Sequence, residues 1–213
     1  MTFSKKMKIT GLTGIIGSGK SSVAAFWLAK FDLSFINADL VGRELLAPGR
    51  SGWEKIRHLC KHFILKDQQI DRIALRQALF HDETLRRRLD QALHPLIRDE
   101  IRRQISILAV SRTDTDVLVE VPLLHEAGWE NDFSEIILVY VDSRQGLGRV
   151  MARDGINRQE AEKAMRAQWP VNDKIMRSDH VIDNSLSWPA TVLQLSSLGR
   201  LLWSEKSIKN LTV

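Results

Sequence analysis

Apolar and polar residues form two kinds of pattern along the chain. Short, mostly apolar runs predict strands, and stretches with apolar residues three and four positions apart predict helices. Strands are expected at about residues 8–13, 33–36, 116–121, 135–141 and 180–182. Helices are expected at about 20–30, 39–46, 143–153, 158–168 and 188–203. Because strands alternate with helices, and the runs at 116–121 and 135–141 are apolar almost throughout, the pattern predicts a doubly wound α/β fold with a parallel sheet.

The stretch from Trp53 to about Ile107 has a different pattern. Charged residues are interleaved with Leu, Ile and Ala at helical spacing, which predicts a helical subdomain. Within it, Lys66-Asp67 separates two short apolar runs and predicts a small hairpin. The tail after Glu205 is expected to be frayed.

Length and composition restrict the class of protein. A chain of 213 residues fits one domain, or one domain with an inserted lid. The single cysteine, Cys60, excludes a disulfide scaffold, and no Cys/His spacing suggests zinc. We find no apolar run long enough to span a membrane and no signal peptide in this sequence, so we expect a soluble, cytoplasmic protein without a membrane partner.

The net charge of +5 raises the possibility of nucleic-acid binding, but the charge is unevenly distributed. Residues 1–30 carry five lysines and no acidic residue, and residues 144–177 carry eight basic against four acidic residues. Residues 104–143 carry eight acidic residues and one arginine, and this segment would repel a polyanion. We therefore expect local phosphate sites rather than a nucleic-acid partner. Lys5, Lys6 and Lys8 have no assigned role.

The strongest motif is Gly14-x-x-x-x-Gly19-Lys20-Ser21, which matches the phosphate-binding P-loop and lies between an expected strand and an expected helix. Its small residues allow backbone N–H groups to curl around phosphate oxygens, and the helix dipole adds to the attraction. Lys20 would supply charge to the β- and γ-phosphates of ATP, and Ser21 would offer a hydroxyl to Mg²⁺. The residues expected at the nucleotide are Gly14, Gly17, Ser18, Gly19, Lys20, Ser21 and Ser22.

Two further features bear on phosphoryl transfer. Asp39 follows the second expected strand, where its carboxylate could accept a proton from an attacking hydroxyl or could simply cap the next helix. Arg149 and Arg153 share one helix face, where they could meet charge that develops on the transferred phosphoryl group or could belong to a solvated face. These residues alone do not decide between the two interpretations of Asp39, or between the two interpretations of Arg149 and Arg153.

Several separated motifs, taken in their order along the chain, resemble a known family more specifically than the P-loop alone does. After the P-loop come Ala38-Asp39, the sequence Leu93-His94-Pro95-Leu96-Ile97-Arg98, and Val121-Pro122-Leu123-Leu124-His125-Glu126. The order ends with Arg149-x-x-x-Arg153, Gln168 and Val181-Ile182-Asp183-Asn184. Over about residues 8–186 the chain resembles the dephospho-coenzyme A kinase family.

This resemblance implies ATP-dependent phosphorylation of the ribose 3′-hydroxyl of dephospho-CoA. It also implies a nucleotide-kinase-like P-loop fold of three layers with a five-stranded parallel sheet. The implied core covers about 7–47, 112–143 and 178–205, with a helical CoA-binding insertion at about 48–111 and a lid at about 144–177. Lys20, Asp39, Arg149 and Arg153 would be catalytic, and Asp39, His94, Pro95, Arg98 and Leu124 would lie on the acceptor side.

The chain departs from the family pattern at three positions. Ile15 replaces the usual second glycine and fits without strain only if its φ is negative. Asn37 replaces the usual first aspartate of Asp-Ala-Asp, and Ser22 replaces a threonine.

Some residues and functions have more than one interpretation. Glu120 and Glu126 could assist Mg²⁺ through water, or they could lie at the surface or cap helices. The alternatives to a dephospho-CoA kinase are another P-loop kinase of a nucleoside, nucleotide or small metabolite, and a non-catalytic ATP-binding regulator. The sequence does not indicate an oligomeric state.

Overall fold

A computed structural model describes residues 7–112 and 115–203, with the side chains of residues 80 and 81 excepted. Lys5, Lys6 and the tail expected to fray lie outside the described residues. The chain divides into two compact units, one made of Met1–Ile36 with Leu108–Val213 and the other of Asn37–Ile107.

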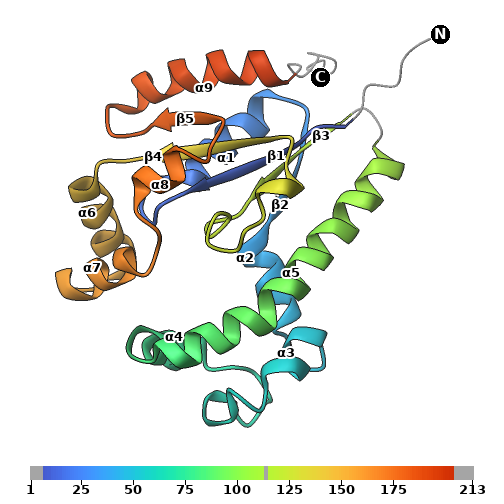
Figure 1. The fold of residues 1–213 in the computed structure, drawn as a ribbon, viewed down its shortest axis with the longest axis vertical. Coiled ribbons are helices and arrows are strands. Elements are labelled where there is room, and N and C mark those ends of the chain that lie inside the picture. Colours follow the sequence, from blue (N-terminus) through green and yellow to red (C-terminus); the bar gives the residue numbers. More distant parts are fainter. Residues whose placement is uncertain (1–6, 113–114, 204–213) are drawn as a thin grey trace, which may run out of the picture. The chain divides into compact units, whose positions relative to one another are not determined.

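The first unit contains a five-stranded sheet in the order β2-β3-β1-β4-β5 (Figure 1). The strands are β1 (Ile9–Gly14), β2 (Leu33–Asn37), β3 (Asp116–Glu120), β4 (Glu135–Tyr140) and β5 (His180–Asp183). β1 pairs in parallel with both β3 and β4, and β4 pairs in parallel with β5. The predicted α/β fold with a parallel sheet is therefore confirmed, and the strand bounds differ from the expected ones by at most one residue.

An apolar core fills one face of the sheet, beneath α1 (Lys20–Lys30) and α9 (Trp188–Leu202). Trp27 is fully buried, its indole N–H donates to the Leu195 carbonyl at 2.9 Å, and its ring meets Trp203 edge-on. Gly199 lets α9 approach closely, since a Cβ there would lie 2.3 Å from the Phe31 ring. This packing fixes α1, the helix that begins at the P-loop, against β1 and β3.

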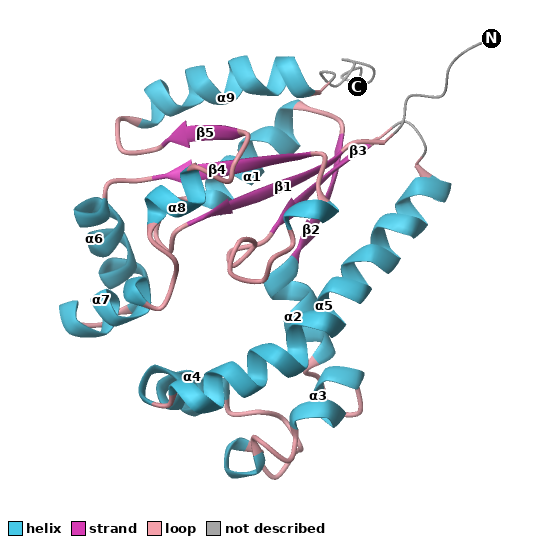
Figure 2. Cartoon of the chain, viewed as in Figure 1, coloured by secondary structure: helices cyan, strands magenta, loops and turns pink. Residues whose placement is uncertain are grey.

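The opposite face is covered by α8 (Val171–Ile175), which contacts β4, and by the segment 121–133, which contains η2 (Glu130–Asp132) (Figure 2). A Cβ on Gly11 of β1 would lie 2.8 Å from Leu124 and 3.0 Å from Phe133, so these two side chains pack directly on the strand. Helices or loops thus cover both faces, as in a three-layer fold.

Two helices follow β4, as Figure 1 shows, and pack against each other: α6 (Ser143–Asp154) and α7 (Arg158–Arg166). Asp142 caps the first through the N–H groups of Arg144 and Gln145, and Asn157 and Glu160 form a capping box at the second. Gly155 ends α6 in the left-handed conformation with φ 63°. Local sequence therefore determines both helices and the break between them.

The second unit is helical apart from one antiparallel bridge. It contains α2 (Ala38–Leu45), α3 (Ser51–Ile56), η1 (Lys61–Phe63) and α4 (Arg72–His81), and α5 (Glu83–Ser111) begins in it. Ile64 and Ile70 form the bridge, so the hairpin expected at Lys66-Asp67 is confirmed. Trp53, Ile56, Cys60 and Leu89 are buried in a core separate from that of the sheet. No helix among the described residues combines the length and apolarity needed to cross a membrane.

Candidate functional site

The P-loop connects β1 to α1 and is shaped by three glycines with positive φ. Gly14, Gly17 and Gly19 have φ values of 150°, 80° and 89°. Gly19 is also the N-cap of α1 and supplies no capping side chain, and the first turn of α1 contains no acidic residue. No acidic side chain of the first turn itself opposes the positive end of this helix dipole, which is suited to an anion.

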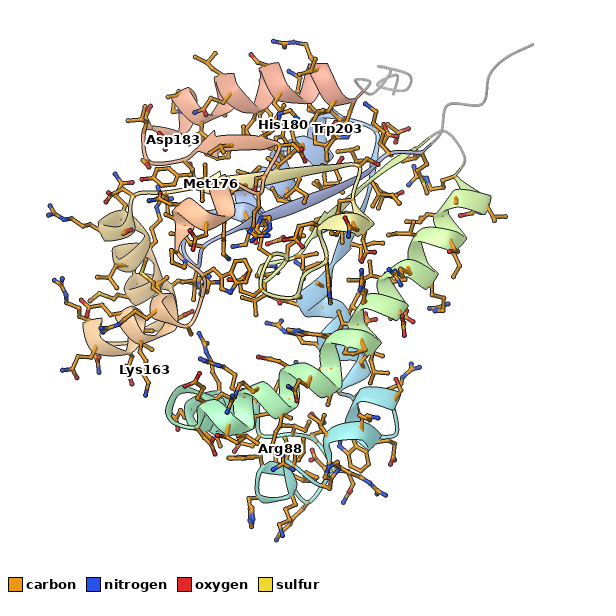
Figure 3. All side chains as sticks on the ribbon, in the orientation of Figure 1. Arg88, Lys163, Met176, His180, Asp183 and Trp203 are labelled. Carbon is orange, nitrogen blue, oxygen red and sulfur yellow. The ribbon has the colours of Figure 1, made fainter. Side chains whose placement is uncertain are left out.

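Each of these glycines also permits a close approach by another element. A Cβ on Gly14 would lie 2.4 Å from the Val139 carbonyl oxygen. A Cβ on Gly17 would lie 2.5 Å from the Gly146 carbonyl oxygen. A Cβ on Gly19 would lie 2.5 Å from Nδ2 of Asn184. The loop is thus enclosed by β4, α6 and the residue after β5. Figure 3 labels Asp183 at the end of β5, directly before Asn184.

Ile15 and Ser18 have buried side chains within the loop. Ile15 is only 6% exposed and is not among the described residues with positive φ, so it fits the loop without backbone strain. Ser18 is fully buried, and its hydroxyl has no hydrogen-bond partner. The backbone N–H of Ser18 donates to the Ile15 carbonyl oxygen at 3.1 Å, within the loop.

The side chain of Lys20 folds back over the start of the loop. Its ammonium donates hydrogen bonds to the carbonyl oxygens of Gly14 at 2.9 Å and Ile15 at 3.0 Å. An ammonium on a flexible stem can exchange such neutral acceptors for charged phosphate oxygens at small cost.

Ser21 and Glu120 form the only pair of oxygen ligands that we assign beside the loop in the described part of the chain. The Ser21 hydroxyl donates to Oε1 of Glu120 at 3.2 Å, although the two residues are 99 positions apart. Glu120 is 4% exposed at the end of β3, so a surface position for it, one of the expected alternatives, is wrong. Hydroxyl and carboxylate oxygens suit Mg²⁺, which usually takes one or two protein ligands together with water and phosphate.

Gln168 and Asn184 hold the loop from outside. Oε1 of Gln168 accepts a hydrogen bond from the Ile16 N–H at 2.7 Å. The Asn184 amide donates to the Ser18 carbonyl at 2.8 Å, and its oxygen accepts from Thr191 at 3.0 Å. Both residues belong to the sequence motifs, but sequence reasoning gave them no role because it contained no information about which segments meet.

Of the two arginines on α6, the structure brings Arg149 to the loop. Its guanidinium donates to the Asn184 carbonyl at 3.0 Å, and Nη1 would lie 3.9 Å from a Cβ on Gly19. Arg153 instead forms a bidentate pair with Asp154 at 2.9 Å, and these hydrogen bonds raise the pKa of Arg153. Arg153 would have to leave Asp154 in order to contact a nucleotide.

Asp39 is the second residue of α2 and is exposed. The N-cap of this helix is Asn37, whose Oδ1 accepts from the Leu40 N–H at 3.0 Å. The capping explanation of Asp39 is therefore wrong, and the unusual Asn37 has a structural role of its own.

The residues expected on the acceptor side lie in different places. His94, Pro95 and Arg98 are on α5, where His94 pairs with Asp90 at 3.8 Å. Burial raises the pKa of Asp90, while His94 and Arg86 partly oppose this shift. Leu124 is fully buried against Gly11, so it exposes no surface to a substrate in this structure.

The second unit contains a cavity of about 400 Å³. Glu100, in its wall, accepts a bidentate hydrogen bond from Arg103, which lowers the pKa of Glu100 to about 2. The lining residues combine charged and apolar groups: Val41, Glu44, Leu45, Arg50, Glu100, Arg103 and Gln104.

Comparisons with known proteins identify relatives of this chain. A family described as dephospho-CoA kinase matches residues 8–189. A dephospho-CoA kinase from Synechococcus sp. is 41% identical over 82% of this chain and 83% of its own length. A second, from Carboxydothermus hydrogenoformans, is 38% identical over 95% of this chain and 98% of its own.

Two solved structures also resemble this chain over most of its length. A crystal structure from Thermus thermophilus has a TM-score of 0.77 at 30% identity and covers 94% of this chain and 100% of that one. The dephospho-CoA kinase of Campylobacter jejuni has a TM-score of 0.66 at 25% identity, with coverage of 92% and 96%. The chain belongs to the dephospho-CoA kinase family.

Proposed function

We propose that the protein transfers the γ-phosphoryl group of ATP to the ribose 3′-hydroxyl of dephospho-CoA, giving CoA and ADP. Family membership supports the reaction, and the P-loop supports the use of a nucleoside triphosphate. The observation that carries the proposal is the enclosed loop itself, in which three positive-φ glycines, the α1 N-terminus and Lys20 converge. Such a loop is suited to the phosphates of a nucleotide.

Three groups of the first unit would act at the phosphates. Lys20 would leave its two carbonyl partners and neutralise charge on the β- and γ-phosphates. Ser21 and Glu120 would hold Mg²⁺, which would supply neutralising charge at the phosphates. Arg149, already beside Gly19, would stabilise charge on the transferred group, with Arg153 contributing only after release from Asp154.

Asp39 would accept the proton of the 3′-hydroxyl or orient that hydroxyl for attack. Its exposure and its freedom from the capping role support this assignment. The hydroxyl oxygen forms the new bond to phosphorus, and ADP departs with the electrons of the broken bond.

The second unit would hold the acceptor. His94, Pro95 and Arg98 are its expected contacts, and the cavity beside Arg50 and Arg103 offers space for part of the molecule. We propose residues 48–111 as the acceptor-binding insertion and 144–177 as the lid. Leu124 would act indirectly, by packing on Gly11. We also propose a cytoplasmic location, the compartment expected from the sequence.

The test is an assay of ADP release with Mg-ATP and a panel of acceptors that includes dephospho-CoA, nucleosides, nucleotides and small alcohols. We expect dephospho-CoA to be the preferred acceptor. Its product should be CoA, and a 3′-phosphatase should convert it back to dephospho-CoA. A better acceptor in the panel would indicate a different kinase, and ATP binding without acceptor-dependent turnover would indicate a regulator.

A further inference from the structure

A buried ion pair lies outside the residues that contact phosphate in the proposed function. Nζ of Lys174, on α8, lies 2.7 Å from Oε1 of Glu126, in the loop after β3. The Lys174 side chain is completely buried, and that of Glu126 is 13% exposed. The second oxygen of Glu126 is buried without a hydrogen-bond partner. Burying two charges is costly, and a pair retained at such a cost can serve to specify one arrangement of the chain.

The pair connects to the P-loop through the segment that precedes α8. The oxygen of Glu126 that meets Lys174 also accepts a hydrogen bond from the Trp169 N–H at 3.0 Å. The neighbouring residue, Gln168, accepts from the Ile16 N–H of the P-loop at 2.7 Å. Glu126 therefore fixes the backbone next to the side chain that holds Ile16.

A second connection leads back to the same loop. Lys174 donates to the Pro122 carbonyl at 3.5 Å, and that carbonyl also accepts from the Thr13 hydroxyl at 3.3 Å. Thr13 and Ile16 flank the start of the P-loop. The contacts thus form a closed ring that reaches the loop on both sides of Gly14 and Ile15, with the ion pair at its far side.

We propose that Glu126 and Lys174 are positioning residues of the phosphate loop, which hold Gln168 where it fixes the Ile16 N–H. In this role the pair sets the shape of the loop before the nucleotide arrives and touches no substrate itself. This inference is compatible with any nucleotide donor, but its kinetic test rests on the proposed function.

A purely structural role makes a different prediction. Replacing a buried ion pair with well-packed apolar residues is often neutral or stabilising for the fold. If the pair only stabilised the first unit, the double variant Glu126→Leu/Lys174→Met would match the wild type in both stability and nucleotide binding. If the pair positions Gln168, the double variant would match the wild type in stability but would bind the nucleotide more weakly. The reason is that a leucine side chain at position 126 cannot accept a hydrogen bond from the Trp169 N–H.

The experiment compares the wild type, this double variant, Gln168→Ala and the triple combination. Thermal unfolding reports folding, titration with a non-hydrolysable ATP analogue reports loop function, and kcat and KM for ATP are measured with dephospho-CoA. We expect the double variant to unfold within about 4 °C of the wild type and to bind the analogue about ten-fold more weakly, with KM affected more than kcat. The triple variant should bind no more weakly than the double variant, since both changes remove the same hold on Ile16.

Analogue affinity equal to that of the wild type in the double variant would overturn the inference. So would a triple variant whose loss of affinity is the product of the losses in the double variant and in Gln168→Ala. If the double variant does not fold, Glu126→Met/Lys174→Met decides in the same way, with and without Gln168→Ala, because methionine at position 126 again offers no oxygen to the Trp169 N–H. Lys163→Met, an exposed change on α7 labelled in Figure 3, is the matched control and should bind as the wild type does. Analogue binding by a wild type that does not phosphorylate dephospho-CoA would defeat the proposed function and leave this inference testable.

Discussion

The hydroxyl of Ser21 donates a hydrogen bond of 3.2 Å to the carboxylate of Glu120, which joins the first turn of α1 to the end of β3. A Mg²⁺ ion held by these two residues would depend on the negative charge of Glu120, because Ser21 is neutral. The geometry of this pair therefore leads directly to a measurable metal dependence.

Replacing Glu120 with Gln keeps the shape of the side chain and removes its charge. We expect the Mg²⁺ concentration that gives half-maximal activity to rise about ten-fold, as for other losses of support at a metal site. Metal-free nucleotide binding should change little, which a titration in chelator can measure. Glu162→Gln, on α7, is the control, and an equal shift in that variant would argue against a metal role of Glu120.

Gly19→Ala tests the shape of the loop. The left-handed backbone, with φ 89°, would cost about 1–2 kcal/mol for any residue with a Cβ. The new methyl group would also lie 2.5 Å from Nδ2 of Asn184, which holds the Ser18 carbonyl. We expect ATP-analogue affinity, measured by calorimetry, to fall at least about ten-fold.

Gly148→Ala is the matched control for that change. Gly148 lies on α6 with no positive φ, and a Cβ there meets nothing within 4 Å. Alanine favours a helix over glycine by about 1 kcal/mol, so this variant should be as stable as the wild type or more stable, with unchanged affinity. Equal losses in both variants would show that the loop conformation is not what matters at Gly19.

Asp39→Asn tests the base. Because Asn37, not Asp39, caps α2, the substitution should not destabilise the helix through a lost cap. We expect kcat to fall about one hundred-fold or more, while ATP affinity stays the same. A variant with wild-type kcat would remove Asp39 from the mechanism. Asn37→Ala is a useful contrast, since it should lower stability through the lost cap.

The two arginines of α6 should not be equivalent. Arg149 already contacts the residue beside the loop, whereas Arg153 is held by Asp154. We expect Arg149→Ala to lower the single-turnover rate of phosphoryl transfer about one hundred-fold or more, and Arg153→Ala to lower it less. The reverse order would indicate that the lid rearranges so that Arg153 becomes the main contact.

Cys60 reports on the second unit. The thiol is fully buried, and burial raises its pKa from 9.0 to about 11. At about pH 8 the folded protein should therefore react with a thiol reagent at least about one hundred-fold more slowly than the unfolded chain. Because unfolding lowers this pKa, stability should decrease as the pH rises from about 9 towards 11, which denaturant titrations can follow. Rapid reaction of the native protein would show that this core opens readily.

Local patterns determined much of this protein. The apolar runs predicted all five strands, and the glycines around Lys20 predicted the P-loop together with the class of ligand it suits. Capping residues such as Asp142 and Asn157 account for the bounds of α6 and α7. These features depend on periodicity, backbone freedom and contacts within a few residues, all of which can be read along the chain.

The tertiary structure decided which distant residues meet. From the sequence, Glu120 and Glu126 could assist Mg²⁺, lie at the surface or cap helices. The order β2-β3-β1-β4-β5 places β3 beside β1 and brings Glu120 to Ser21. Lys174 gave no local sign that it would be fully buried against Glu126, and Gln168 none that it would hold Ile16. The physical reason is that burial, and therefore the cost of a charge and its choice of partner, depends on the packing of elements that are far apart in the sequence.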